Sequence, residues 1–428
     1  MSEKRLPADG MDRRTFLKVS GVAGLGVAAS TFGVPKLLRA APPAIKIGSV
    51  QPATGPLAFI GQGQRKANLL AVEYINSKGG IKSLGGAKLE LLLGDSESKA
   101  EVGRSEADRL IKSGSVLLIG PFQSGVAMAI ATLAEQRQIP FVMDVAAMDA
   151  ITQKGYKYSF RIFVTGSSFA KSAVQYLKQI LKETNTSPKR AIVTNTGDPF
   201  GKSQGGGFIK AMKNSNMPIE IVEHIVYPLG IQDLSAEVAR IKAAKPDLLF
   251  PVCRPGDSAI MTRELYKQRV ELMGIYSPGS PGWYEPKVIK DLGKLVYYVM
   301  DTAPWYNPDS PVYQQASKQF HDKYDLSMDL NTGFAYTGIL VIADALERAG
   351  STKPDELVKA IKQTNLEAHP LVGDAIKFNE NGDNINATCT LLQVIPDPDP
   401  AKRVKVVLPE KFAQAKYVFP APQLWERK

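Results

Sequence analysis

The sequence predicts an α/β protein with two doubly wound lobes, because short buried strands alternate with amphipathic helices along most of its length. The unit at residues 116–143 shows this pattern most clearly. An apolar run ends at Gly120, apolar residues then recur at helical spacing, and Pro140 precedes a second apolar run. A strand that leads through a helix into another strand is a parallel βαβ unit. The alternation resumes after residue 165, and 428 residues suffice for two such cores.

The turn between the first strand of this unit and its helix is a candidate ligand site. Ligands of parallel α/β sheets bind outside the carboxyl ends of the strands. Phe122, Gln123 and Ser124 lie there, and Ser124 stands where a helix N-cap is expected. Backbone N–H groups and a hydroxyl at a helix N-terminus can hold a carboxylate or a phosphate.

The other elements follow from the same pattern. In the first lobe we expect strands at 45–50 and 89–93, a loop at 54–61, and helices at 67–76 and 100–112. The second lobe is expected to contain a helix at 168–182 and strands at 191–194, 219–226, 248–252 and 273–276. The segment 296–300 then leads back toward the first lobe, where we expect helices at 311–324, 334–349 and 354–363. A hairpin of 375–378 with 390–394 and a surface strap at 405–428 are expected to follow.

Several short motifs indicate a family. The pattern GPxxS, helix, IPxxxxxA, LTxxGY is matched by Gly120, Pro121, Ser124, Ile139, Pro140, Ile151, Thr152, Gly155 and Tyr156. A TGPLA loop at 54–58, an INxKGGI segment at 75–81 and an FRI segment at 160–162 add to it. This set resembles the leucine/isoleucine/valine-type periplasmic binding proteins, the extracytoplasmic receptors of ABC importers, over nearly the whole chain after residue 44.

The resemblance implies a type I periplasmic binding protein fold, in which three hinge crossings join two lobes. The expected N-terminal lobe is 45–162 plus 303–385, the C-terminal lobe 165–300 plus 388–400, and the strap 401–428. The implied function is hinge-closing capture of a small solute by a monomer and its delivery to a membrane permease, without a cofactor. The alternatives are a sensory receptor of the same fold and a binding protein for branched-chain amino acids proper. An exported enzyme is a more distant alternative.

The first forty residues are expected to be a signal peptide and not part of the fold. Residues 12–18 (DRRTFLK) resemble the twin-arginine export motif, and a mild Gly/Ala-rich apolar segment at 19–34 follows. This segment is too short to span a membrane. The expected location is therefore the periplasm.

Charge and reactive side chains exclude several classes of function. The net charge is +11, and +7 without residues 1–40, but no Lys/Arg run with interleaved aromatics predicts nucleic-acid binding. Three scattered histidines lack metal-ligand spacing, and no nucleophile motif occurs, so we expect neither a metal site nor an enzyme. Cys253 and Cys389 are not expected to form a disulfide.

A near match to a nucleotide-binding loop occurs at 196–203 (TGDPFGKS). It is one residue shorter than the phosphate loop requires, and Pro199 removes a backbone donor. The resemblance instead implies that Phe200 covers a ligand from the second lobe.

Departures from the family pattern bear on specificity. Amino-acid-binding relatives hold the carboxylate with the loop Ser and a Thr, and meet the ammonium with a Tyr and an acid. Here Ser124 is kept, Ala147 replaces the Thr, and Arg254 replaces the Tyr. Gly279 or its neighbour Ser280 replaces the acid. A guanidinium without a nearby anion favours a carboxylate ligand over an amino acid, unless Arg254 pairs with Asp257.

The expected ligand is therefore an aromatic acid, a keto acid or a dicarboxylate. The residues expected to line its site are Phe59, Ile60, Phe122, Gln123, Ser124, Val145, Ala146, Ala147, Phe200, Arg254 and Gly279.

Overall fold

A computed structural model describes residues 42–428, and its strands form two separate sheets. The predicted export motif at 12–18 lies outside the described residues. We call the part built on the first sheet the N-terminal lobe and the part built on the second the C-terminal lobe. The doubly wound α/β class predicted from the sequence is confirmed.

The N-terminal lobe has a five-stranded parallel sheet in the order β2-β1-β3-β4-β5. Its strands are β1 (Ile45–Gln51), β2 (Leu89–Asp95), β3 (Leu117–Ile119), β4 (Phe141–Met143) and β5 (Ser159–Arg161). The helices of this lobe are α1 (Ala58–Ser77), α2 (Ala100–Lys112), α3 (Ser124–Arg137), α9 (Pro311–Tyr324), α10 (Leu330–Ala349) and α11 (Pro354–Lys362).

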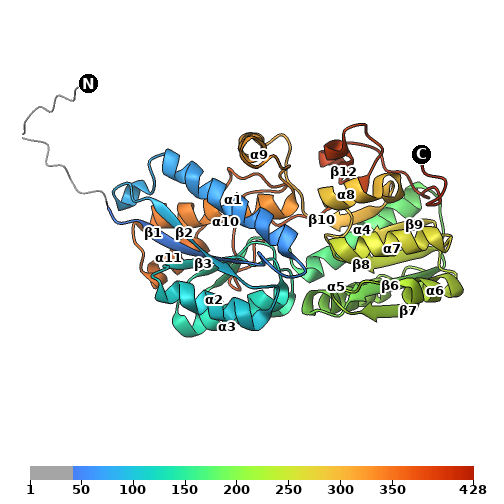
Figure 1. The fold of residues 1–428 in the computed structure, drawn as a ribbon, viewed down its shortest axis with the longest axis horizontal. Coiled ribbons are helices and arrows are strands. Elements are labelled where there is room, and N and C mark those ends of the chain that lie inside the picture. Colours follow the sequence, from blue (N-terminus) through green and yellow to red (C-terminus); the bar gives the residue numbers. More distant parts are fainter. Residues whose placement is uncertain (1–41) are drawn as a thin grey trace, which may run out of the picture. The chain divides into compact units, whose positions relative to one another are not determined.

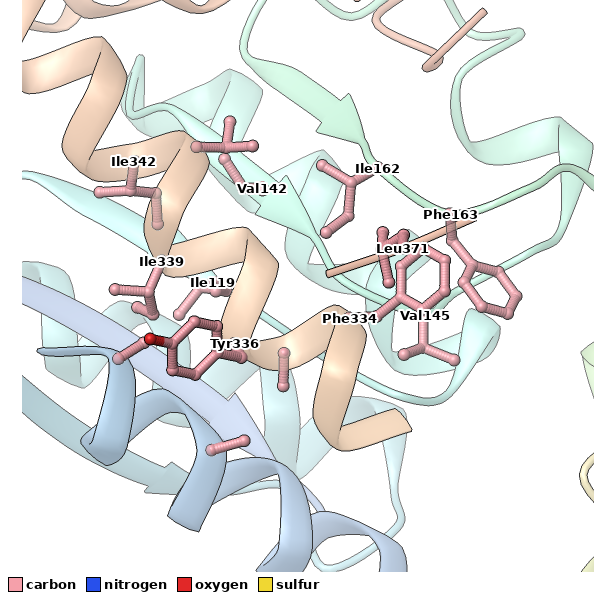
Figure 2. Packing of buried hydrophobic residues seen from close by; sticks show 14 of the residues in the cluster. Ile119, Val142, Val145, Ile162, Phe163, Phe334, Tyr336, Ile339, Ile342 and Leu371 are labelled. Atoms are coloured by element: carbon pink, nitrogen blue, oxygen red, sulfur yellow. The ribbon is translucent and has the colours of Figure 1, made fainter. Parts of the chain in front are cut away.

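Helix α10 belongs to the core of this lobe although it comes late in the chain. In Figure 1 the orange α10 lies beside the blue α1, which it contacts extensively. Figure 2 shows Ile339 of α10 pointing toward Ile119 of β3. Gly338 allows this approach, since a Cβ there would lie 2.6 Å from the Ile119 side chain. The first lobe is thus completed only when the chain has returned from the second.

The C-terminal lobe has a seven-stranded sheet in the order β12-β11-β10-β9-β8-β6-β7. The strands are β6 (Arg190–Thr196), β7 (Glu220–Tyr227), β8 (Leu248–Val252), β9 (Gly274–Ser277), β10 (Met300–Ala303), β11 (Thr390–Val394) and β12 (Val404–Leu408). Strand β11 pairs antiparallel with both β10 and β12, and the other pairs of this sheet are parallel. The helices are α4 (Gly166–Glu183), α5 (Pro199–Asn214), α6 (Ser235–Ala244), α7 (Pro255–Lys267) and α8 (Pro286–Leu292).

The chain passes between the two sheets three times, at 162–165, 304–310 and 363–389. A buried ion pair ties the first of these passages to the third. The Arg161 guanidinium lies 2.8 Å from the Asp383 carboxylate and also donates to the carbonyl of Met148. The crossing segments are therefore held together at the edge of the N-terminal lobe.

Several expected elements differ in the structure. The segment 296–300, expected to lead back to the first lobe, instead connects a 3₁₀ turn (Gly293–Val296) to β10, which starts at Met300 and belongs to the C-terminal sheet. The prediction of a hairpin between 375–378 and 390–394 is wrong. Instead, β11 pairs with β10 and β12, and residue 378 makes only an isolated bridge to residue 384. The expected strap contains β12, a strand of the sheet, because its apolar side chains bury against β11.

Helix α1 begins nine residues before the expected start, so Phe59 and Ile60 lie in its first turn and not in a loop. Gly61 makes this possible, because a Cβ there would lie 2.1 Å from the carbonyl oxygen of Pro52.

In residues 42–428 no helix is long and apolar enough to cross a membrane. The same part of the chain contains no His, Cys, Asp and Glu cluster able to hold a metal ion. Cys253 and Cys389 are both buried free thiols.

Candidate functional site

The two lobes meet at a cluster centred on Arg254. Arg254 lies two residues after the end of β8 and is the N-cap of α7. Its guanidinium lies 4.3 Å from the ring centroid of Phe200 at the start of α5, and 5.2 Å from that of Phe122 after β3. Because Phe122 belongs to the N-terminal lobe, this guanidinium contacts both lobes, and only 3% of Arg254 is exposed.

Asp198 is the charge partner of Arg254. Nη2 of the arginine donates to Oδ2 of Asp198 at 2.8 Å. The pKa of the Asp198 carboxyl is lowered: burial opposes this shift, but the Arg254 charge and hydrogen bonds from Thr196 and the Gly201 amide outweigh it. The alternative pairing with Asp257 is wrong for the guanidinium, since the Asp257 carboxylate accepts from the backbone N–H of Arg254 instead.

The same carboxylate occupies the loop that resembles a nucleotide-binding motif. Asp198 is the N-cap of α5 and accepts a hydrogen bond from the Gly201 amide at 3.2 Å. A carboxylate therefore stands where a phosphate would meet the helix N-terminus, and a second anion would be repelled.

Arg254 borders two compartments between the lobes. The inner compartment has a volume of about 20 Å³, enough for about one water molecule. It is lined mainly by aromatic side chains from both lobes: Phe122, Phe163, Phe169, Phe200 and Tyr284, with Val145, Ser280, Pro281 and Asn331.

The outer compartment has a volume of about 400 Å³. Phe59 and Ile60 of α1 face apolar residues of the C-terminal lobe across it, including Leu229, Ile231 and Ile260. Phe59 is 49% exposed, which is unusual for a phenylalanine. This compartment has the size of a small-molecule site, with Arg254 at its boundary.

Hydrogen bonds position the Phe122 turn. The side chain of Gln51, at the end of β1, accepts from the Phe122 amide at 3.2 Å and donates to Asp144 at 2.5 Å. Burial raises the pKa of the Asp144 carboxyl to about 7.

The side chains of Ser124 and Gln123 form hydrogen bonds to backbone groups of the N-terminal lobe. Ser124 is the first residue of α3, one position after the N-cap Gln123. The Ser124 hydroxyl accepts from the amides of Ala147 and Met148 at 3.2 and 3.3 Å, and it does not line the inner compartment. The Gln123 side chain donates to the Ser98 carbonyl, and its own amide oxygen is buried without a partner.

Of the residues expected after β4, only Val145 lines the inner compartment. Ala146 and Ala147 are buried, and their carbonyls accept from the Arg161 guanidinium and the Gly166 amide.

Gly279 shapes the site through its backbone. Its φ is +112°, and a Cβ there would lie 2.4 Å from the Phe169 ring that lines the inner compartment. The next residue, Ser280, donates its amide to Asp301 at 3.2 Å. Burial raises the pKa of the Asp301 carboxyl well above its usual range.

Sequence reasoning missed Asn331 and Glu285. Asn331 lies in the first turn of α10, and its amide donates to the buried Glu285 carboxyl at 2.6 Å across the lobes. The Asn331 side-chain oxygen and the second Glu285 oxygen are buried without partners. Burial raises the pKa of Glu285 well above its usual range, and nearby Asp329 adds to this shift. The capping box Asp329-x-x-Thr332 was the available signal for this helix start.

A model of the periplasmic binding protein family matches residues 44–398, most of the chain. The chain belongs to this family. Among curated proteins, the chain is 25% identical over 339 residues to a Leu/Ile/Val-binding protein of Rhizobium johnstonii, covering 79% of this chain and 88% of the relative. The chain is thus a periplasmic binding protein of the branched-chain amino-acid type, as its motifs predicted.

Solved structures of this fold agree with the architecture. A branched-chain amino acid transporter substrate-binding protein from Streptococcus pneumoniae, in complex with isoleucine, has a TM-score of 0.73 at 20% identity, covering 86% of this chain and all of that one. A solute-binding protein from R. palustris, in complex with benzoate, has a TM-score of 0.72 at 18% identity, with coverages of 89% and 97%. The type I periplasmic binding protein fold is therefore confirmed.

The coarse function follows from the family. The chain is an ABC-transporter substrate-binding protein, a class of proteins that bind small molecules and are located outside the cytoplasmic membrane. Its homologues are solute-binding proteins and not enzymes.

Proposed function

We propose that this periplasmic binding protein captures a small carboxylate with an aromatic or branched apolar body and delivers it to an ABC permease. One observation carries the proposal: a buried arginine, Arg254, contacts both lobes at the boundary of an apolar compartment of about 400 Å³. Closure of the lobes on a ligand at this position would shift an open–closed equilibrium.

The free donor of Arg254 supports a carboxylate ligand. Asp198 takes one end of the guanidinium, and Nε is buried without a hydrogen-bond partner. Guanidinium groups carry five N–H donors in a planar fork, so a ligand carboxylate can bind beside Asp198. Leaving a buried charged donor unpaired is costly, and an anionic oxygen is the partner that best removes this cost.

The surrounding acids do not favour an ammonium group. Asp198 is already paired with Arg254. Burial raises the pKa of Asp301 and Glu285 well above the usual range, so the charged form of each carboxyl is disfavoured. An amino acid would therefore bring its ammonium into a site without a free anion, whereas benzoate or a keto acid would not.

A branched-chain amino acid is the second candidate ligand. One observation favours it: Glu285 keeps a buried oxygen without a partner one residue from Tyr284, which lines the inner compartment. An ammonium placed there would favour the charged form of Glu285.

Calorimetry at moderate salt distinguishes these ligands. Benzoate, leucine and 4-methyl-2-oxopentanoate are titrated into the wild type and into Arg254→Ala. We expect the two carboxylates without an ammonium to bind, and Arg254→Ala to weaken them about ten- to hundredfold, as expected for a lost hydrogen bond to a charged group. Tight leucine binding that is unchanged in Arg254→Ala would contradict the proposal.

Export through the twin-arginine route is the second part of the proposal, supported by Arg13 and Arg14 within the motif DRRTFLK. Replacing both arginines by lysines keeps the charge and is expected to leave the precursor in the cytoplasm. Fractionation of cells that express each form measures this. Unchanged periplasmic accumulation of the double variant would refute this route.

A further inference from the structure

We call the inner and outer compartments together the cleft. A further cavity lies on the other side of Tyr284 from the inner compartment. Its volume is about 590 Å³. Tyr284 lines both this cavity and the inner compartment of the cleft, so its ring forms a shared wall. The other lining residues come from α8, from α9, from the segment before α10, and from the loop before β12. Both lobes therefore contribute to it.

A run of aromatic rings forms one wall of this second cavity. Trp305 and Tyr306 follow β10, and their ring centroids are 4.6 Å apart. Tyr306 stacks on Tyr313 of α9 at 4.2 Å with an angle of 3° between the planes. Tyr284 meets Trp305 edge-on at 5.4 Å. Such a wall favours a planar aromatic ligand, because further rings can pack against it at little cost in conformational entropy.

The polar groups of the cavity favour an anionic ligand. Trp305 is 2% exposed, and its indole Nε1–H has no hydrogen-bond partner. The Tyr306 hydroxyl is close enough to interact with the indole but is not in hydrogen-bonding geometry. An indole N–H is a donor only, so it needs an acceptor atom from a ligand.

The rim of the cavity carries charges of both signs. Lys290 of α8 and Lys318 of α9 are exposed and line the cavity. The Asp329 carboxylate also lines it, but this group already accepts from the amide and hydroxyl of Thr332, at 2.8 and 2.7 Å. Asp399 and His321 line the cavity as well, and Lys318 pairs with Asp322. Lys290 is therefore the lysine of the rim that is best placed to meet an anionic ligand.

We infer that this cavity is a second small-molecule site, distinct from the cleft, that takes a planar aromatic carboxylate. The rings pack against Tyr313 and Trp305, and the carboxylate accepts from the indole N–H or faces Lys290. Because the cavity is larger than one ring requires, the ligand class includes two-ring acids. The site does not depend on the ligand proposed for the cleft.

The test uses ¹⁹F NMR of protein labelled with 5-fluorotryptophan. The chain has three tryptophans, and Trp305→Phe assigns the resonance of interest. Titration with 1-naphthoate should shift the Trp305 resonance in a saturable way. Arg254→Ala should leave this shift intact, because Arg254 lines both compartments of the cleft but does not line the second cavity. Loss of the Trp305 shift in Arg254→Ala would refute a separate site.

Variants of the wall make the test specific. Tyr313→Ala should weaken 1-naphthoate binding about two- to tenfold, the effect of losing one aromatic contact. Ser317→Phe, which fills the cavity from α9, should abolish it. Tyr266→Ala, which removes an exposed tyrosine of α7 away from this cavity, is the matched control and should bind as the wild type does.

Two further outcomes would overturn the inference. One is a Trp305 resonance that does not respond to millimolar 1-naphthoate in the correctly folded wild type. The other is equal binding of 1-naphthylmethylammonium, the cationic analogue of similar shape, which would show that the site does not select an anion.

Discussion

Replacing Asp198 by asparagine should strengthen carboxylate binding. The carboxylate of Asp198 shares the Arg254 guanidinium with the proposed ligand and carries the same charge. Asparagine keeps the N-cap of α5, because it caps helices as well as aspartate does. The variant therefore removes the competing charge without removing the cap.

The magnitude can be worked from the geometry. With Asp198 at 2.8 Å from Nη2, a ligand carboxylate on Nε would lie near it. Two carboxylates about 6 Å apart repel by about 3 kcal/mol at an effective dielectric of about 20. Salt and side-chain relaxation reduce this value, so benzoate should bind about tenfold more tightly to Asp198→Asn.

The same substitution should destabilise the ligand-free protein. Arg254 is 3% exposed, and its guanidinium would lose the Asp198 carboxylate with which it forms an ion pair. Removing one member of a buried ion pair typically costs about 3–5 kcal/mol. Benzoate should then raise the thermal unfolding temperature more in Asp198→Asn than in the wild type, because binding restores an anion beside Arg254.

Calorimetry and thermal unfolding with and without benzoate measure both effects. Asp108→Asn is the matched control, because it breaks an ion pair with Arg137 in which that arginine is half exposed. The control should change stability by about 1 kcal/mol or less and leave benzoate binding unchanged. Weaker benzoate binding in Asp198→Asn would mean that Asp198 orients Arg254 for the ligand rather than competing with it, and would refute this reasoning.

Three further predictions concern residues around the cleft. Ser124→Ala should lower the free energy of unfolding in urea by about 1–3 kcal/mol, because two backbone amides lose the acceptor that they share; an unchanged value would contradict this. Gly279→Ala should lower the free energy of unfolding by more than about 1 kcal/mol, because Gly279 has a positive φ and a Cβ there would touch the Phe169 ring. As a control, Gly206→Ala, at a helical position with open space around it, should raise the free energy of unfolding by up to about 1 kcal/mol. Because the pKa of Asp144 is raised, the folded protein binds more protons than the unfolded chain between about pH 4 and 7. The contribution of this group to stability therefore falls by up to about 4 kcal/mol as the pH rises through that range. Asp144→Asn should flatten this part of the pH profile in urea unfolding, and an identical profile would refute the assignment.

The fold was predictable because its signals are local. The βαβ unit at 116–143 is marked by apolar runs, glycine and proline, and the structure has β3, α3 and β4 there. The start of α1 was not predictable from periodicity. It depends on Gly61 packing against the Pro52 carbonyl, a contact that exists only in three dimensions.

The candidate site was predictable only in part. Phe122, Phe200 and Arg254 each follow a strand, so the parallel topology brings them to one region, and they do lie together. Asp198, the partner of Arg254, was missed because it lies 56 residues away in the sequence. The sequence pattern around Asp198 indicates only a loop that resembles a nucleotide-binding motif. The neighbour in sequence, Asp257, is used by the backbone instead.

The sizes of the two compartments decide how a ligand can bind at Arg254. The inner compartment, at about 20 Å³, cannot take an aromatic ring unless Phe122 and Phe200 move apart. That movement would break the contacts of both rings with Arg254, each worth about 0.5–2 kcal/mol. The outer compartment, at about 400 Å³, accepts such a body without this cost. We therefore expect the apolar part of the solute to lie against Phe59 and Ile60, with only its carboxylate reaching Arg254, so that the existing contacts between Arg254 and Phe122 keep the lobes closed around it.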